Sequence, residues 1–253
     1  MARRPRRRHP SSARAVAAEQ HRHDRLAVVD ALRGVGIVLM VAYHFAFDLA
    51  WFRMIRADFN HDRFWLVARV VIVTIFLALV GVSLVLAKRA HPGPQPFWRR
   101  VALIAACAVL VTIASYLTFP QTFITFGILH AIAVSSVLAR PLLGFPRLAF
   151  VSGIAIVALG AMVQLPVFDR PWLNWIGMMT HKPATEDYVP LFPWLGVVLI
   201  GVAFGALLPR MQRALVAANR FAPAWLAWLG RHSLVIYLVH QPLLVGALRV
   251  WSE

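Results

Sequence analysis

The sequence predicts an all-α integral membrane protein, a polytopic bundle of transmembrane helices. Apolar residues make up 60% of the chain and charged residues only 14%, whereas soluble domains are nearer half apolar and a quarter charged. The apolar residues come in runs of about twenty, the length that crosses a bilayer core of roughly 30 Å. Proline and basic residues occupy the breaks between these runs. One integral domain, rather than several soluble ones, is therefore expected.

About seven spans can be drawn, and one long connection, 169–190, lies between the fifth and the sixth. The predicted spans are 27–52, 64–87, 101–119, 121–139, 147–168, 191–209 and 232–250. Residues 1–25 hold eight arginines and almost no large apolar residues, a composition typical of a disordered tail. We therefore predict a basic cytoplasmic tail over 1–25 and a single membrane domain over 26–253. The first span is too long for a signal peptide and is expected to stay attached.

The distribution of basic residues predicts how the chain is oriented. Eighteen of the 26 Lys and Arg residues fall on the side of the N-terminus and seven on the opposite side. The positive-inside rule then places the N-terminus in the cytoplasm and the C-terminus outside, in what we expect to be a bacterial inner membrane. The net charge of +16 serves this orientation, so nucleic acid is not an expected partner.

Several kinds of chemistry are excluded by what the sequence lacks. Cys107 is the only cysteine, so neither an intrachain disulfide nor a thiolate metal cluster can form. The P-loop and HExxH motifs are absent, which argues against an ATP-driven pump and a zinc hydrolase. No metal is expected.

The first span carries two pairs of ionisable residues at helical spacing. Asp30 and Arg33 are three residues apart and share a helix face, where they can form a structural ion pair or serve a ligand. His44 and Asp48 are four apart, so the carboxylate could orient the imidazole as a general base. Alternatively, His44 has only a packing or gating role, and Asp48 merely caps the outer end of the span.

Two later spans also carry polar groups at depth. His130 lies about 12–14 Å below the outer surface, the depth estimated for His44, so both could face one cavity. A hydrogen bond to a neighbouring helix is the alternative for His130. His240 and Gln241 lie inside the last span beside Pro242, which suggests a kink. They are candidates for the substrate site.

Both faces of the predicted bundle offer binding groups. On the outer side, Asp187 and Tyr188 could meet a polar substrate, and His61 is an exposed titratable group. On the cytoplasmic side, the basic residues could bind the phosphates of a nucleotide cofactor, although orientation alone would explain them. These residues are Arg33, Lys88, Arg89, Arg99, Arg100 and Arg231.

Four blocks, taken in order, resemble the heparan-alpha-glucosaminide N-acetyltransferase catalytic family. They lie at 25–45, 126–132, 187–194 and 229–242. The broader transmembrane acyltransferase group shares an Arg and a His spaced as Arg33 and His44 are. The resemblance implies acetyl transfer from cytoplasmic acetyl-CoA, as co-substrate, to an extracytoplasmic sugar or glycan.

The same resemblance bears on the residue roles. It implies that a membrane-embedded histidine is the base or acyl carrier, a role that fits His44, with Asp48 orienting it and His130 or Arg33 serving the carbonyl or the donor. The family's active histidine usually follows the first span, which makes His61 a rival. The animal enzymes are much longer, so a heparan acceptor is an analogy only.

A second reading of the sequence is a proton-coupled membrane transporter that uses the same buried His and Asp groups. Transporters more often show two related halves, and no such repeat is visible here. A structural subunit without chemistry is a third, weaker reading. Membrane lipid is an expected partner, and a homodimer is an option that the sequence leaves open.

Overall fold

The computed structural model describes residues 26–252, and every regular element among them is a helix. The predicted tail, 1–25, lies outside the described residues. The main helices are α2 (Ala27–Trp51), α3 (Arg63–Ala90), α4 (Pro94–Thr118), α5 (Ile128–Ala139), α6 (Pro146–Met162), α7 (Leu191–Leu207), α8 (Gln212–Phe221), α9 (Ala224–Arg231) and α10 (Ser233–Ser252). Short 3₁₀ helices cover Arg140–Gly144, Pro166–Asp169, Asn174–Ile176 and Leu208–Met211.

Five of these helices are long and apolar enough to cross a membrane: α2, α3, α4, α7 with the 3₁₀ turn that follows it, and α10. The prediction of an all-helical bundle is thus confirmed for the described residues, and five of its helices are candidate membrane spans. The segments Ile128–Gly144 and Pro146–Met162 are apolar but shorter. The prediction of seven spans depends on whether these two also cross.

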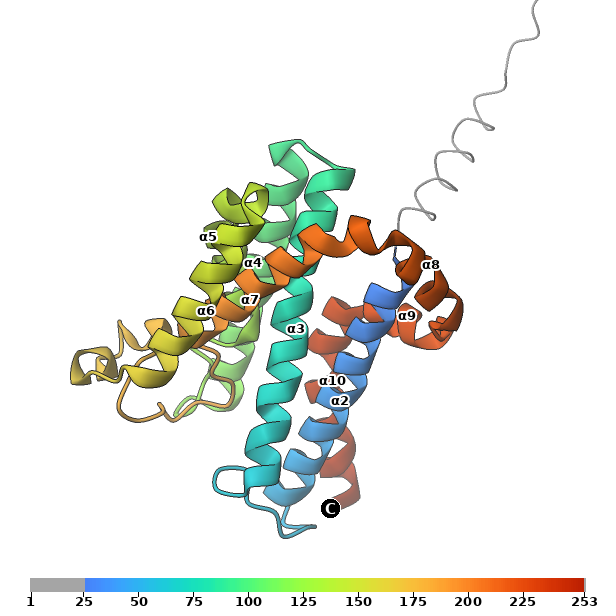
Figure 1. Ribbon diagram of the computed structural model, residues 1–253. Helices are drawn as coiled ribbons and strands as arrows, with labels where there is room; N and C mark the ends of the chain where they lie inside the picture. The colour runs from blue at the N-terminus through green and yellow to red at the C-terminus, as the bar shows by residue number, and fades with distance from the viewer. Residues whose placement is uncertain (1–25, 253) are drawn as a thin grey trace, which may run out of the picture.

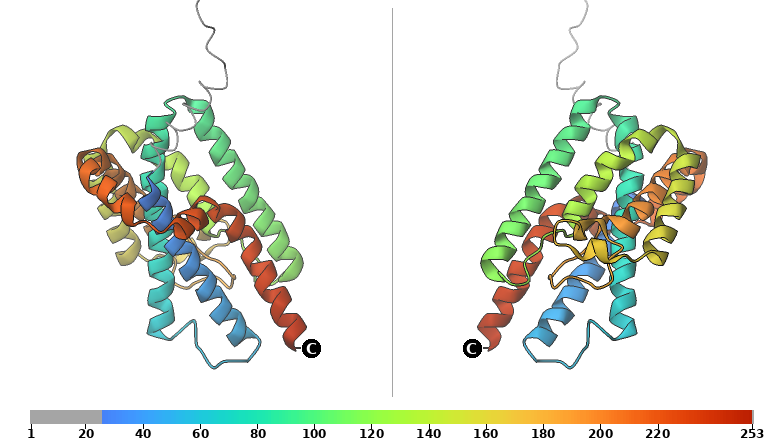
Figure 2. Two further views of the ribbon diagram at one scale, coloured as in Figure 1. Left: turned by 90° about the vertical axis from the view of Figure 1, so that its right-hand side faces the viewer. Right: turned by 90° about the vertical axis from the view of Figure 1, so that its left-hand side faces the viewer.

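The helices run up and down between two ends of the bundle (Figures 1 and 2). We call one the basic end; it holds the connections 91–93, 140–145 and 208–232. We call the other the loop end; it holds the connections 52–62, 119–127 and 163–190. In Figure 1, α2 lies beside α3 on one side and α10 on the other, while α5, α6 and α7 form the opposite flank.

Close helix packing at glycines organises the α3, α6 and α7 flank. A Cβ at Gly201 would collide with Ala78 of α3, and one at Gly205 would meet Val82. Gly153 of α6 and Gly196 of α7 are equally tight against each other's backbones. Gly201 and Gly205 therefore pack as the small-residue spacing predicts.

The basic end is reinforced by α8 and α9, which the span prediction left as a connection. A side chain at Gly34 of α2 would collide with Leu226 of α9, and one at Gly230 would collide with Asp30. The side chain of Asn219 in α8 accepts a hydrogen bond of 2.9 Å from the N–H of Val28. The two short helices thus bind the start of α2.

The predicted ion pair in the first span is confirmed. Arg33 Nη1 lies 3.0 Å from Asp30 Oδ1, and Arg33 Nη2 donates to Ser83 Oγ at 2.6 Å. Arg33 also reaches the carbonyl of Gly230 at 3.5 Å. Because it joins α2, α3 and α9, Arg33 is a structural cross-link at the basic end.

Three predicted boundaries differ by six or more residues, one of them the end of the fifth span, which falls at Met162 rather than 168. The third helix begins at Pro94 rather than 101, because proline is well tolerated in the first helical turn. The fourth begins at Ile128 rather than 121, since residues 119–127 form a connection that is held by side chains.

Candidate active site

Two histidines from opposite ends of the chain meet inside the bundle. His44 of α2 and His240 of α10 have ring centroids 4.9 Å apart, and Nε2 of His240 lies 3.2 Å from Nδ1 of His44. His240 is buried and His44 is half-buried. The packing of α10 on α2 makes this pair possible.

Backbone carbonyls determine the tautomers of the neutral rings. Nδ1 of His240 lies 2.7 Å from the carbonyl of Tyr237, and Nδ1 of His44 lies 3.0 Å from the carbonyl of Met40. A carbonyl only accepts, so both Nδ1 atoms carry the hydrogen. Nε2 of His240 then accepts from His44. Nε2 of His44 is left with a lone pair, as a general base requires.

Asp48 has a different partner from the one predicted. Its Oδ1 accepts a hydrogen bond of 2.8 Å from Nε2 of Gln241 on α10. In the described chain, the contacts that orient His44 come from Met40 and His240 instead. The expectation that Asp48 orients His44 is therefore not matched by the hydrogen bonds. Asp48 and Gln241 form a second contact between α2 and α10, next to the histidine pair.

His130 lies in a separate but connected polar cluster. The hydroxyl of Thr112 donates to the carbonyl of Ile124 at 2.8 Å, so at 3.3 Å it accepts from Nε2 of His130. Nδ1 of His130 accepts from the N–H of Gly127 at 3.3 Å. The ring is thus held between α4 and the start of α5. A hydrogen bond to a neighbouring helix was the alternative to a cavity shared with His44, and the structure shows such a bond.

Tyr237 connects the two clusters. Its hydroxyl donates to Oδ2 of Asp187 at 3.3 Å, while its carbonyl accepts from His240. The same Oδ2 accepts from the N–H of Ile128 at 2.9 Å, at the start of α5. His44, His240, Tyr237 and Asp187 therefore form one chain of polar contacts, and the Asp187 charge acts on His130 at its far end.

The environment of Asp187 disfavours the ionised form of its carboxyl. Burial raises the pKa of this carboxyl, and the Ile128 N–H, Tyr237, His130 and Lys182 oppose the rise without cancelling it. Gly127 makes the site possible, because a Cβ there would collide with the Asp187 carboxyl. Asp187 thus lies in the polar cluster, and its role in substrate binding stays a prediction.

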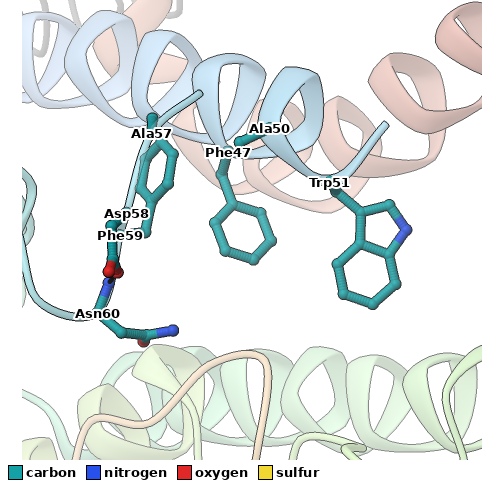
Figure 3. Close-up of a pocket in the computed structure, with 7 residues that line it drawn as sticks. All are labelled: Phe47, Ala50, Trp51, Ala57, Asp58, Phe59 and Asn60. Atoms are coloured by element: carbon teal, nitrogen blue, oxygen red, sulfur yellow. Dashed lines mark hydrogen bonds between the residues drawn. The ribbon is translucent and has the colours of Figure 1, made fainter. Parts of the chain in front are cut away.

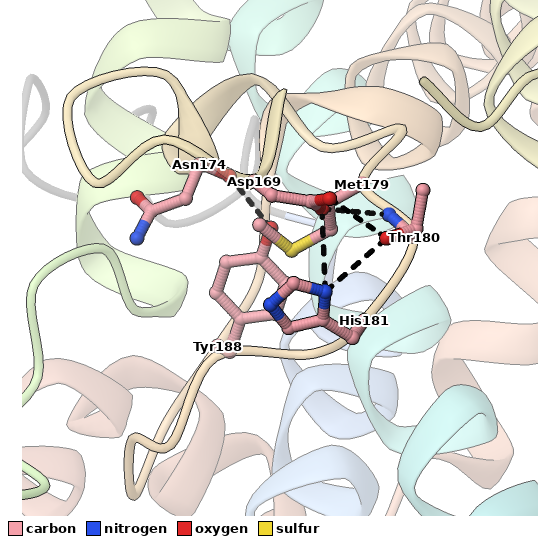
Figure 4. Close-up of polar contacts among 6 residues, drawn as sticks. All are labelled: Asp169, Asn174, Met179, Thr180, His181 and Tyr188. Carbon is pink, nitrogen blue, oxygen red and sulfur yellow. Dashed lines mark hydrogen bonds and ion pairs between the residues drawn. The ribbon is translucent and has the colours of Figure 1, made fainter. Parts of the chain in front are cut away.

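Tyr188 holds the long connection 163–190 together. Its hydroxyl donates to the carbonyl of Asn174 at 2.6 Å and contacts Sδ of Met179 at 3.0 Å (Figure 4). Burial raises the pKa of Tyr188 above its ordinary value. Asp169 accepts from the N–H and the hydroxyl of Thr180, at 2.8 and 2.7 Å. These bonds place Tyr188 as a support of the loop that carries Asp187.

A cavity of about 380 Å³ lies at the loop end, beside the last turns of α2. Phe47 and Trp51 project from α2 toward the space that Asn60 borders (Figure 3). The buried ring of Phe59 stacks on Trp65 with centroids 4.2 Å apart and anchors the connection 52–62. The lining residues are Phe47, Ala50, Trp51, Ala57, Asp58, Phe59 and Asn60. Phe47 lies one helical turn beyond His44.

His61 stands at the rim of the loop end. Its Nδ1 lies 2.9 Å from Oδ2 of Asp58, and its side chain is 86% exposed. The backbone N–H of Asn60 and then the His61 ring hold the pKa of Asp58 below its usual value. His61 is thus an oriented but solvent-exposed imidazole, whereas His44 is enclosed by helices.

A second cavity of about 370 Å³ lies at the basic end between α3, α4 and the 140–144 turn. Lys88, Arg100 and Arg140 line it, together with apolar side chains such as Phe97. The guanidinium of Arg140 lies 4.8 Å from the ring centre of Phe97 and 5.1 Å from that of Trp98. Three cations and an aromatic wall suit a nucleotide with phosphates.

Only part of the predicted basic set lines this cavity. Lys88 and Arg100 do, whereas Arg89 donates to the carbonyl of Ala206 at 3.3 Å, and neither Arg99 nor Arg231 is among the lining residues. Arg140 and Tyr237 are among the residues at these sites that were not selected from the sequence, as are Phe47, Asp58 and Asn60 of the loop-end cavity. The break at 140–147 was visible as a basic stretch, but only the fold brings it against Lys88.

Comparison with known families gives a match that covers most of the chain. The model of the family described as heparan-alpha-glucosaminide N-acetyltransferase, catalytic, matches residues 25–242. That range includes α2 through the first half of α10, and with them both histidine clusters. Searches among curated proteins and solved structures found no significant match.

Proposed function

Because this chain belongs to the heparan-alpha-glucosaminide N-acetyltransferase catalytic family, we propose that it is an integral membrane enzyme that transfers acetyl from acyl-CoA to a sugar or glycan. The observation that carries the proposal is the His44–His240 contact, which leaves Nε2 of His44 available as a base. In this proposal the donor binds at the basic end and the acceptor at the loop end.

The donor site is the basic-end cavity. Lys88, Arg100 and Arg140 offer the charge-assisted hydrogen bonds that phosphates prefer. Phe97 and the apolar side chains beside it offer a surface for the adenine and the arm that carries the thioester. With the orientation predicted from the basic residues, this cavity opens to the cytoplasm, where acyl-CoA is made.

The acceptor site is the loop-end cavity. Its volume of about 380 Å³ lies within the usual range of small-molecule pockets. Phe47, Trp51 and Phe59 can pack against the apolar faces of a sugar ring, while Asp58 and Asn60 can bond to its hydroxyls. Because Phe47 is one turn from His44, an acceptor bound there is next to the base.

The reaction itself needs one base and one leaving group. Nε2 of His44 accepts the proton from the acceptor's hydroxyl or amine as the acceptor's oxygen or nitrogen bonds to the thioester carbonyl carbon. The carbon–sulfur bond then breaks, and the sulfur leaves as the thiolate of CoA and takes up the proton. The transfer consumes one acyl-CoA and yields one acetylated sugar and one free CoA.

The proposal is tested with the full chain purified in detergent. Labelled acetyl-CoA and glucosamine, a simple amino sugar, are incubated with the wild type and with His44→Ala. Labelled acetylglucosamine is expected with the wild type only. Equal product from both proteins would remove His44 from the mechanism.

The buried titratable groups His44, His240 and Asp187 would also suit a proton-coupled transporter. Proteoliposomes separate the two functions, because a transporter moves an intact sugar in response to a pH gradient. Sugar uptake without acetylation, combined with no acetyl transfer in detergent, would favour the transporter and reject the enzyme.

A further inference from the structure

The contact between Asp48 and Gln241 contains two buried acceptors that lack a donor. Asp48 is only 3% exposed, and its Oδ1 accepts from Nε2 of Gln241 at 2.8 Å. Within residues 26–252, Oδ2 of Asp48 and Oε1 of Gln241 are both buried without a hydrogen-bond partner. Buried polar atoms are nearly always paired, so two bare acceptors in one contact require an explanation.

The surroundings of Asp48 disfavour an ionised carboxylate. In the described chain no Lys or Arg nitrogen forms an ion pair with it, although three other acidic groups have such pairs or a histidine partner. The charged group that acts on Asp48 from the long connection is Glu186, which is itself acidic. The titratable groups nearby on α2 and α10 are His44 and His240, which bond to each other.

Among the described residues, the charge of Arg69 on α3 acts on Tyr43 of α2 and forms no ion pair with Asp48. Arg69 acts on Lys182 of the long connection, where loss of water and then the Arg69 charge lower the pKa of Lys182. A buried carboxylate with no cation at hand is unfavourable, and such a group usually becomes neutral instead.

We propose that Asp48 carries a proton on Oδ2 and donates it to Oε1 of Gln241. The acid and the amide then share two hydrogen bonds, with the amide N–H donating to Oδ1 and the acid O–H donating to Oε1. One proton thus satisfies both bare acceptors.

The Asp48–Gln241 pair affects the reaction through the neighbouring His44 and His240. Gln241 follows His240 directly, and Asp48 lies one helical turn from His44, so the acid–amide pair sets α10 against α2 where the imidazoles meet. Asp48 is therefore a positioning residue for His44. Removing its proton at high pH leaves two acceptors facing each other, which pushes α10 from α2 and separates His240 from His44.

Infrared spectroscopy of the full chain tests the proton directly. A protonated carboxyl gives a carbonyl stretching band distinct from that of a carboxylate. The wild-type spectrum at neutral pH should contain a component of this band that Asp48→Asn lacks, apart from the component that the buried carboxyl of Asp187 contributes to both spectra. Asp58→Asn is the matched control, because the lowered pKa of Asp58 keeps that exposed carboxyl ionised. A band unchanged in Asp48→Asn would overturn the proposal.

A second variant, Gln241→Leu, tests the same hydrogen bond if Asp48→Asn fails to fold. Gln241→Leu keeps Asp48 but removes the amide acceptor, so the acid band should shift in frequency because its hydrogen bond is lost. An unshifted band would show that the proton does not reach Gln241 and would overturn the pairing.

The positioning role rests on the proposed function and has its own readout. Wild-type transfer should fall on the alkaline side of its pH profile, and Asp48→Asn should remove that fall, because its amide N–H replaces the acid O–H at every pH. An alkaline fall that persists in Asp48→Asn overturns the role in positioning. If no acetyl transfer occurs at any pH while the acid band is present, the proposed enzyme function is rejected. The proposal of a protonated Asp48 paired with Gln241 is then still supported.

Discussion

Nδ1 of His44 lies 3.2 Å from Nε2 of His240, although 196 residues separate them in the chain. Both rings are anchored by carbonyls of their own helices, at Met40 and Tyr237. The pair is therefore directional: hydrogens point from His44 to His240, and the free lone pair of His44 points elsewhere.

His44→Ala should reduce acetyl transfer at least about a hundredfold, the usual scale for a general base. The protein should still fold, because the change leaves one buried acceptor, Nε2 of His240, without its donor, at a cost of about 1–3 kcal/mol. His61→Ala is the matched control, since its ring is also oriented but exposed. Turnover is measured for both variants at equal protein. Loss of turnover in His61→Ala with normal turnover in His44→Ala would place the chemistry in the 52–62 connection.

Replacing Arg100 and Arg140 together by Gln should raise the KM for acetyl-CoA by about tenfold or more, because each charge-assisted hydrogen bond contributes roughly 1.5–3 kcal/mol. Arg99→Gln is the control, since Arg99 has the same charge on the same helix but does not line the cavity. Steady-state kinetics would measure both. An equal KM in all three proteins would reject the donor site.

Asp187→Asn should change how stability depends on pH. Burial raises the pKa of Asp187, so the fold favours the neutral carboxyl, and wild-type stability should decline as pH rises from about 4 toward the raised pKa. The variant cannot ionise there and should lack that part of the decline. Thermal unfolding in detergent at several values between about pH 4 and about pH 7 tests this. Parallel curves for the two proteins would contradict the expectation.

Gly230→Ala should destabilise the protein by about 1–3 kcal/mol, the usual cost of overpacking. The new Cβ would collide with the Asp30 carbonyl and push α9 from α2. Gly246→Ala is the matched control, because nothing lies within 4 Å of its Cβ position. Melting temperatures should fall for the first variant only. A similar Tm for both would show that the α2–α9 contact can relax.

Reporter fusions at residues 92 and 180 should read cytoplasmic and external, respectively. The motivation is the excess of Lys and Arg on the side of the N-terminus. The two sites also lie at opposite ends of the bundle, in the 91–93 and 163–190 connections. If both reporters occupied one compartment, the proposed orientation and the cytoplasmic donor site would fail together.

The helices could be predicted from sequence because burial in lipid demands long apolar runs, and such runs are easy to read. The short helices α8 and α9 were missed because neither is a long apolar run. Their sequences are mixed, and their contacts with α2 depend on Gly34 and Gly230, whose roles appear only when the backbones meet. The late start of α5 was missed because the side chains of Thr112 and Ser115 extend the preceding connection well beyond Pro120.

The candidate site was predictable in its residues but not in its pairings. Buried His and Asp residues stand out in apolar runs, so His44, Asp48, His130 and His240 could be selected. Spacing along one helix suggested that Asp48 serves His44, yet its partner is Gln241 on another helix. Local spacing cannot identify a partner that comes from the far end of the chain. Tyr237 shows the same limit, because its bond to Asp187 depends on a loop fold.

The distance along α3 from the level of His44 to the basic-end cavity sets how long the proposed donor must be. Ile72 of α3 packs with Met40, one turn from His44, and Lys88 marks the basic-end cavity on the same helix. The helix between them rises about 24 Å at 1.5 Å per residue. A donor whose phosphates stay at Lys88 must therefore carry its acetyl group on a long flexible arm through the bundle. Acetyl phosphate, which has no such arm, is too short to be held at one end and react at the other.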